Sequence, residues 1–241
     1  MPGSNLVLTI DIDWAHDTVI ADLAGIVAEH GVAATWFVTH DTPVLREITA
    51  IPRQDLGLHP NFNPLLDGTG SGNARAVVGA LHDLVPDARC VRGHSLARSS
   101  RIAQVLVEHG ITHESNHMIP PTVAPALEPW RDFSGLIHAA IRWEDDVRLL
   151  DASLGEPADH LGIVCPFVVD FHPIHVFLNT TTIAEYEAAR GDARAPEALL
   201  SRRRPSGTGG SRDRLLTLLR AARGHGDPGT LLRDLKPSEI G

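Results

Sequence analysis

The chain has 241 residues, 43% of them hydrophobic, and a formal net charge of −9. A chain of this length and apolar content can bury one sizeable core, so we interpret residues 1–241 as a single domain. Its 30 acidic residues exceed its 21 basic ones, which argues against a nucleic acid partner because phosphate backbones are bound by clustered cations.

The N-terminal residues and the two cysteines bear on the cellular compartment. Residues 1–13 contain no cationic leader, and the first apolar run stops at Asp11, so neither a signal peptide nor a membrane-spanning helix is predicted. Cys90 and Cys165 lie far apart without CxxC spacing, which favours a reduced pair of small core residues over a disulfide. We therefore expect a cytoplasmic protein.

Short apolar runs alternate with amphipathic stretches along the chain. The predicted strands are Leu6–Ile10, Ala33–Val38, Leu56–Leu58, Cys90–Val91, Leu136–Ile141 and Ile163–Phe171. The predicted helices are Thr18–His30, Asn73–Leu84, Ser99–His109, one that follows Thr180 and ends at Arg190, and Asp213–Ala222. Gly31 and Gly110 follow two of these helices, at the position where a left-handed residue commonly ends a helix.

Repeated strand–helix units predict an α/β fold, either a parallel barrel or a doubly wound sheet. Both folds carry their chemistry at the carboxyl ends of the strands. Residues 201–212 are rich in Gly, Ser and Arg. This composition predicts a loop, either a mobile one near the active face or a poorly ordered connector.

Polar side chains able to do chemistry follow five of the predicted strands. They are Asp11 and Asp13, then His59 and Asn63, then Arg92, His94 and Ser95, then Trp143, Glu144, Asp145 and Asp146, and finally Asp170 and His172. Taken singly each group has a structural explanation, since aspartates cap helices and Asn-rich turns bond their own backbone. Their order along the chain is stronger evidence for a functional site than any single group.

In that order the groups resemble the five motifs of the polysaccharide deacetylase family, the NodB homology domain. The resemblance runs from Leu8 to about Asn179. It implies a distorted (β/α) barrel and metal-dependent removal of an acetyl group from an N-acetylated amino sugar. The cofactor it implies is a divalent metal ion, zinc above all, with Co, Ni, Mn or Fe as alternatives.

The first motif resembles the family's aspartate pair, which supplies a catalytic base and a metal ligand. Here one residue separates Asp11 from Asp13, where the family has none. Because side chains alternate along an extended strand, the two carboxylates are predicted to point to the same side. The family order makes Asp11 the base and Asp13 the ligand.

The second motif departs from the family, which has two metal-binding histidines four residues apart. His59 matches the first, but Asn63 stands at the second position. If a helical turn starts at the strand end, both side chains lie on one face, where an imidazole nitrogen and an amide oxygen can meet one cation. We interpret Asn63 as a metal ligand; the alternatives are that it orients a water or that the site has lost its metal.

The last three motifs supply the remaining roles. By resemblance Arg92 pairs with the base, and His172 protonates the leaving amine; Asp170, on the same face of the strand, orients it. His175 is the competing assignment for the acid. The residues assigned to substrate binding are Trp14, His94, Ser95, Trp143, Glu144 and Asp145.

The predicted partner is a small amino-sugar substrate from surface polysaccharide or antibiotic biosynthesis, and the sequence does not predict an oligomeric state. Two other classes of function stay open. One is a hydrolase of another small amide or ureide on the same fold. The other is a metal-free carbohydrate-binding relative, which Asn63 keeps open because it lacks the family's second histidine.

Overall fold

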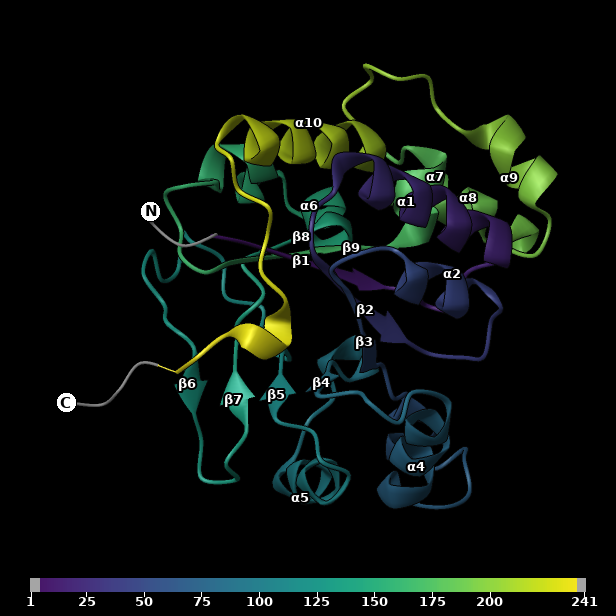
Figure 1. The fold of residues 1–241 in the computed structure, drawn as a ribbon. Helices are drawn as coiled ribbons and strands as arrows, with labels where there is room; N and C mark the ends of the chain where they lie inside the picture. The colour runs from purple at the N-terminus through teal and green to yellow at the C-terminus, as the bar shows by residue number, and fades with distance from the viewer. Residues whose placement is uncertain (1–4, 238–241) are drawn as a thin grey trace.

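A computed structural model describes residues 5–237. A nine-stranded sheet forms its centre, with the strand order β6-β7-β5-β4-β3-β2-β1-β9-β8. The strands are β1 Leu6–Asp11, β2 Ala34–Val38, β3 Gln54–Leu58, β4 Cys90–Val91, β5 His113–Glu114, β6 Trp130–Arg131, β7 Ile137–His138, β8 Trp143–Glu144 and β9 Phe167–Phe171. Paired strands are parallel except for β6 and β7. The sheet curls into a half-barrel that ends at β6 and β8 (Figure 1).

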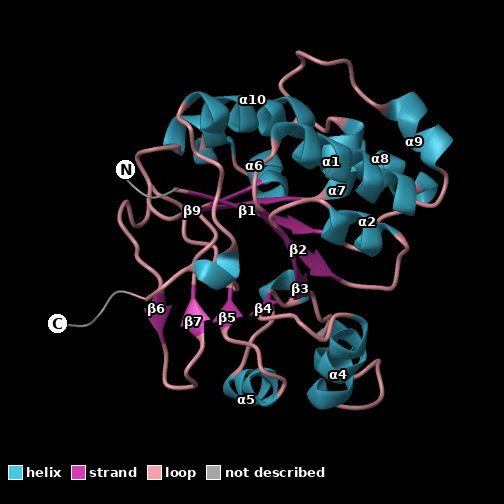
Figure 2. Ribbon diagram, in the orientation of Figure 1, coloured by secondary structure: helices cyan, strands magenta, loops and turns pink. Residues whose placement is uncertain are grey.

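The helices lie around the curled sheet in two groups. They are α1 Asp17–His30, α2 Val44–Ala50, α3 Asn63–Leu66, α4 Ala74–Leu84, α5 Ser100–Glu108, α6 Asp145–Leu150, α7 Pro173–Leu178, α8 Ile183–Ala189, α9 Pro196–Arg202 and α10 Ser211–Gly224. Helix α7 packs against α1 and α10, whereas α4 and α5 pair with each other beside β3 to β5 (Figure 2). Within residues 5–237 no helix combines the length and apolar character needed to cross a bilayer.

The helices and the strand with the clearest hydrophobic patterns in the sequence are present in the structure. Helix α1 buries the apolar side chains that recur at helical spacing and ends at Gly31, whose φ of 64° is left-handed. Every residue of β1 is buried, as expected for a parallel strand covered on both faces. The predicted helices beginning at Asn73 and Ser99 are also confirmed, and each of these two residues caps its helix through its side chain.

Other boundaries were wrong. The predicted strand Ile163–Phe171 begins only at Phe167, directly after Pro166, which has no N–H to donate to a sheet. Of Leu136–Ile141 only Ile137–His138 is a strand. Strand β5 has only two residues, which show no periodicity, and this strand was not predicted.

Two further expectations need correction or restriction. Both cysteines are free, but only Cys90 is buried and Cys165 is exposed, so the prediction of two core cysteines is wrong for Cys165. The predicted loop 201–212 is shorter, since α9 extends to Arg202 and α10 begins at Ser211; its mobility stays a prediction. The N-terminal segment from which the absence of a leader is predicted lies partly outside the described residues, because these begin at residue 5.

The topology decides where the polar strand ends meet. Strands β3, β2, β1, β9 and β8 are consecutive and parallel. Their carboxyl ends therefore lie along one edge of the sheet, together with that of β4. Parallel α/β sheets bind their ligands at this edge.

Candidate active site

Arg92 lies directly after β4 and is 1% exposed. Its guanidinium donates to Asp11 at 2.9 Å and also to Asp170. Two further hydrogen bonds reach the carbonyl and the hydroxyl of Ser115, at 2.9 and 3.0 Å. The ion pair predicted between Arg92 and Asp11 is therefore present, and Asp170 shares the same cation.

The two aspartates after β1 reach the site through a turn. Asp11 ends the strand, whereas Asp13 and Trp14 have φ values of 38° and 54°. Alternation along an extended strand is therefore not what brings the two carboxylates together. Even so, both approach one imidazole: His59 Nε2 lies 3.6 Å from Asp11 Oδ2 and 3.1 Å from Asp13 Oδ1.

His94 joins Asp13 and His59 in a compact triangle of ligand atoms. His94 Nδ1 lies 3.3 Å from Asp13 Oδ1 and 3.3 Å from His59 Nε2, and His59 Nε2 lies 3.1 Å from Asp13 Oδ1. These three residues form a candidate metal-binding group. Burial of Asp13 opposes ionisation, but His59 and His94 together hold the pKa of this carboxyl below its ordinary value.

The triangle fits a divalent cation in size and chemistry. Ligand atoms that lie about 2.0–2.1 Å from a tetrahedral zinc ion are roughly 3.3 Å apart, close to the spacings found here. Asp13 Oδ1 is buried without a hydrogen-bond partner in the structure. One carboxylate and two imidazoles are also a donor set that catalytic zinc sites use while keeping a position open.

The structure does not bring Asn63 into this group in the way predicted. Helix α3 begins at Asn63 itself, so His59 lies before the helix and the two residues do not share a helical face. The Asn63 amide donates to Ser95 Oγ at 3.1 Å. His94, which sequence analysis assigned to substrate binding, occupies the position expected for the third ligand.

The histidine after β9 is oriented by a residue from another strand end. His172 Nδ1 lies 2.8 Å from Asp145 Oδ1, and the His172 backbone N–H donates to Asp145 Oδ2 at 3.1 Å. Asp170 lies farther away, at 3.8 Å, and accepts from Thr9 at 2.7 Å and from Arg92. The predicted orienting role of Asp170 therefore falls to Asp145, which was expected to bind substrate.

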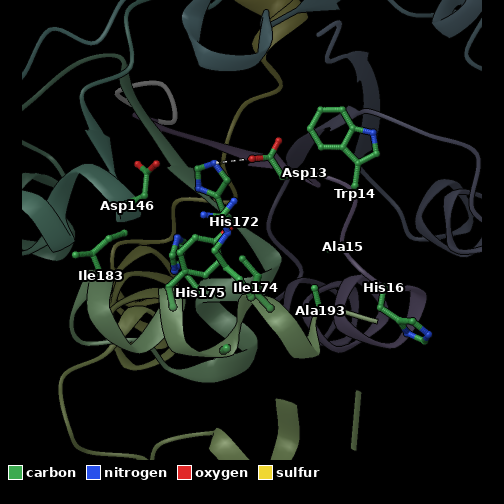
Figure 3. A pocket seen from close by; sticks show the side chains of 13 residues that line it. Asp13, Trp14, Ala15, His16, Asp146, His172, Ile174, His175, Ile183 and Ala193 are labelled. Atoms are coloured by element: carbon green, nitrogen blue, oxygen red, sulfur yellow. Dashed lines mark ion pairs between the residues drawn. The ribbon is translucent and has the colours of Figure 1, made fainter. Parts of the chain in front are cut away.

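The Nε2 atom of His172 faces the ligand group. It lies 3.7 Å from Asp13 Oδ2 (Figure 3). Burial alone would lower the pKa of His172, but the hydrogen bond and charge of Asp145 raise it well above its ordinary value.

Two cavities meet at Asp13, Asp146 and His172. The smaller, of about 120 Å³, lies over the ligand group and reaches Glu144. The larger, of about 190 Å³, is lined by apolar side chains of α7 and α8, including Ile174 (Figure 3). His172 therefore borders both cavities.

The two tryptophans that were assigned to substrate binding, Trp14 and Trp143, differ in their access to these cavities. Trp14 is 47% exposed, lines the larger cavity and meets the His94 ring edge-on at 5.0 Å. Trp143 is fully buried, packs against Phe171 and donates to the Gly155 carbonyl. The prediction that Trp143 contacts the substrate is therefore wrong, because hydrophobic burial places the ring in the core.

Sequence analysis missed two residues that the fold brings to the site, Ser115 and Asn116. They follow β5, a strand of two residues that was not recognised from the sequence. Asp146, which was named with Glu144 and Asp145 but given no role, lines both cavities. Ser95 lines the smaller cavity, and its contact with a substrate stays a prediction.

Solved structures from two bacteria have the same fold as this chain. The peptidoglycan deacetylase PdaC from Bacillus subtilis is 11% identical, with a TM-score of 0.50 over 96% of this chain and 87% of that one. A crystal structure from Bordetella bronchiseptica is 37% identical, with a TM-score of 0.80 over 89% of each chain. It carries a provisional description as a polysaccharide deacetylase involved in O-antigen biosynthesis. The fold described above is thus the NodB-type deacetylase half-barrel.

The family assignment follows from the sequence match. The model of the WbmS-like polysaccharide deacetylase family covers residues 8–190. This chain belongs to that family. No significant match was found among curated proteins.

Glu144 gives a prediction about pH. It is 9% exposed, its Oε2 has no hydrogen-bond partner, and burial together with Asp146 and Asp170 raises its pKa well above 4.5. Above about pH 4.5 the unfolded chain releases a proton that the folded chain retains, so this group destabilises the fold increasingly as pH rises toward its folded pKa. Each unit by which the pKa of Glu144 is raised in the folded state corresponds to about 1.4 kcal/mol of unfolding free energy.

Glu144→Gln removes this titration. In chelator-treated protein, the stability of the variant relative to the wild type should therefore increase between pH 5 and pH 8, measured by urea unfolding at both values. An equal difference in unfolding free energy at the two pH values would contradict the raised pKa.

Proposed function

We propose that this chain is a metal-dependent carbohydrate N-deacetylase. The observation that carries the proposal is the convergence of Asp13, His59 and His94 beside a buried carboxylate and an oriented histidine. These three residues would hold a divalent cation, which when bound would polarise the acyl carbonyl and lower the pKa of a water molecule. Zinc suits the donor set best.

Asp11 serves as the base in this proposal. The guanidinium of Arg92 holds its Oδ1, while its Oδ2 lies 3.6 Å from His59 Nε2 and so borders the ligand group. Asp11 accepts the proton of the attacking water as the water oxygen bonds to the acyl carbon. Arg92 keeps this carboxylate oriented throughout.

His172 serves as the acid. Asp145 fixes its Nδ1, which leaves Nε2 directed at Asp13 and the cavity. As the C–N bond breaks, Nε2 gives its proton to the departing amine nitrogen. The products are then acetate and the free amino sugar.

The substrate class follows from the family and from the cavities. The similarity to the Bordetella bronchiseptica protein supports an acetamido sugar of surface polysaccharide biosynthesis. Trp14 at the rim of the larger cavity offers an aromatic face on which a sugar ring can pack. A ureide or other small amide would need no such exposed aromatic surface.

The two aspartates test the assigned roles. Asp11→Asn should lower acetate release from an N-acetylated amino-sugar panel by roughly two to four powers of ten and leave zinc content near wild type. Asp13→Asn should lower both. Equal zinc loss in the two variants would mean that the roles are wrong, and zinc-free wild type without acetate release would favour a binding-only relative.

His94 and Asn63 test the ligand set. His94→Ala leaves two protein ligands where catalytic zinc sites usually keep three, so its zinc affinity should fall by more than about a hundredfold, beyond the loss typical of an outer-shell change. Asn63→Ala should stay within a few-fold of wild type. Chelator competition measures both, and the reverse order would restore Asn63 as the ligand.

His172 and His175 test the acid. His172→Ala should cost roughly two to four powers of ten in turnover. His175 is 3% exposed, lies 3.3 Å from the Thr180 hydroxyl and packs against Tyr186, so His175→Ala should reduce turnover far less. A near-wild-type rate for His172→Ala, measured as acetate release, would refute the assignment.

A further inference from the structure

The loop that carries His94 has a backbone conformation that it does not stabilise by itself. Ser95 and Leu96 both have a φ of 56°, a left-handed value that side chains with a Cβ adopt rarely and at a cost. Two such residues in succession directly follow the proposed ligand. Contacts from outside the loop must therefore hold it.

The loop also closes tightly on itself. A Cβ placed on Gly93 would lie 2.4 Å from the Ala97 carbonyl oxygen, so the first and last residues of the loop are almost in contact. His94 itself donates its backbone N–H to the Pro60 carbonyl at 3.0 Å. This bond ties the His94 loop to the segment that follows His59.

One buried side chain binds both ends of the loop. Asn116 Oδ1 accepts from the Gly93 backbone N–H at 2.7 Å, and Asn116 Nδ2 donates to the Ala97 carbonyl at 3.2 Å. Asn116 is 4% exposed and belongs to the segment after β5. Its amide therefore bridges residues 93 and 97 from behind, on the side away from solvent.

The orientation of that amide is fixed in turn. Asn116 Nδ2 also donates to Glu114 Oε1 at 3.0 Å, and a carboxylate only accepts hydrogen bonds, so the nitrogen must face Glu114. Glu114 Oε2 lies 3.1 Å from His138 Nδ1, and His138 Nε2 lies 3.0 Å from Asp132 Oδ2. A buried polar network thus extends from the edge strands to the His94 loop.

We propose that Asn116 is a positioning residue that sets the proposed metal ligand His94 by clamping residues 93–97. The inference rests on the ligand set of the proposed function, Asp13, His59 and His94. Asn116 touches none of these side chains in the contacts described above, and acts through the backbone of the loop. Its loss should weaken zinc binding while all three ligands remain in the chain.

Ser115 provides a matched control. It is the neighbour of Asn116, is fully buried, and donates nothing to the loop; its hydroxyl and carbonyl accept from Arg92. Ser115→Ala and Asn116→Ala therefore remove similar small polar groups from one buried segment. Only Asn116→Ala removes contacts to the His94 loop.

The experiment measures zinc dissociation constants by chelator competition, together with the visible spectrum of the cobalt-substituted protein. Asn116→Ala should raise the zinc dissociation constant about tenfold, the low end of the range for residues that hold metal ligands in place, and should shift the cobalt bands. Ser115→Ala removes one hydrogen bond from Arg92 but none from the loop, so it should weaken zinc binding less than Asn116→Ala and keep the cobalt bands of the wild type. Equal affinities and spectra for wild type and Asn116→Ala would overturn the clamp.

A second variant covers the case in which Asn116→Ala does not fold. Asn116→Asp keeps the shape and the acceptor for the Gly93 N–H, but replaces the donor that faces Ala97 and Glu114. It should also weaken zinc binding, and an unchanged dissociation constant would count against the proposal. If the wild type itself binds no zinc, the proposed function is wrong as well; if it binds zinc and both Asn116 variants bind equally, only the clamp is wrong.

Discussion

The buried guanidinium of Arg92 is the constraint on which the site depends. A charge at 1% exposure is costly unless it is paired. Asp11 from β1 and Asp170 from β9 supply the pairing, Ser115 accepts the other hydrogen bonds, and the Phe37 ring lies 4.6 Å from the guanidinium carbon. Four strand ends are thereby held in one relative position. Loss of either carboxylate would leave part of the charge uncompensated.

Around the guanidinium of Arg92 the fold gathers more carboxyl groups than this single positive charge can pair. The carboxyl groups at this edge of the sheet are Asp11, Asp13, Glu144, Asp145, Asp146 and Asp170. Burial raises the pKa of Asp170 to about 7, with Arg92 opposing and Asp11 adding to the shift. A divalent cation at Asp13 would relieve this repulsion. The hydrogen bond and charge of Asp145, followed by the charges of Asp146 and Asp170, raise the pKa of His172 well above its ordinary value, which supports the proposed acid role.

The contribution of the sequence is clearest where a pattern maps directly onto local structure. Hydrophobic periodicity and glycine ends gave α1 and its boundary at Gly31, and the apolar run before Asp11 gave β1. The polar residue types after each strand predicted one shared edge, because parallel strands of a sheet end on the same side. The resemblance to the family's third motif implied that Arg92 pairs with Asp11, and this ion pair is present.

What spacing could not predict was which neighbour each group would meet. Asn63 stands at the expected distance from His59 along the chain, but the helical turn starts too late to align them. His94 takes that place through a loop whose two ends hydrogen-bond to Asn116, two residues after a strand that was not recognised from the sequence. Asp145 likewise reaches His172 from the end of the neighbouring strand β8.

The sequence alone therefore determined the family, the α/β class and the inventory of chemical groups at the strand ends, because residue type and periodicity are local properties. Only the tertiary structure decided that His94 stands beside Asp13, that Asp145 orients His172, and that Trp143 belongs to the core. These choices depend on backbone turns with positive φ and on hydrogen bonds between residues distant in the chain. Such contacts leave no periodic trace in a single sequence, because their energy comes from burial and pairing that exist only once the sheet has curled.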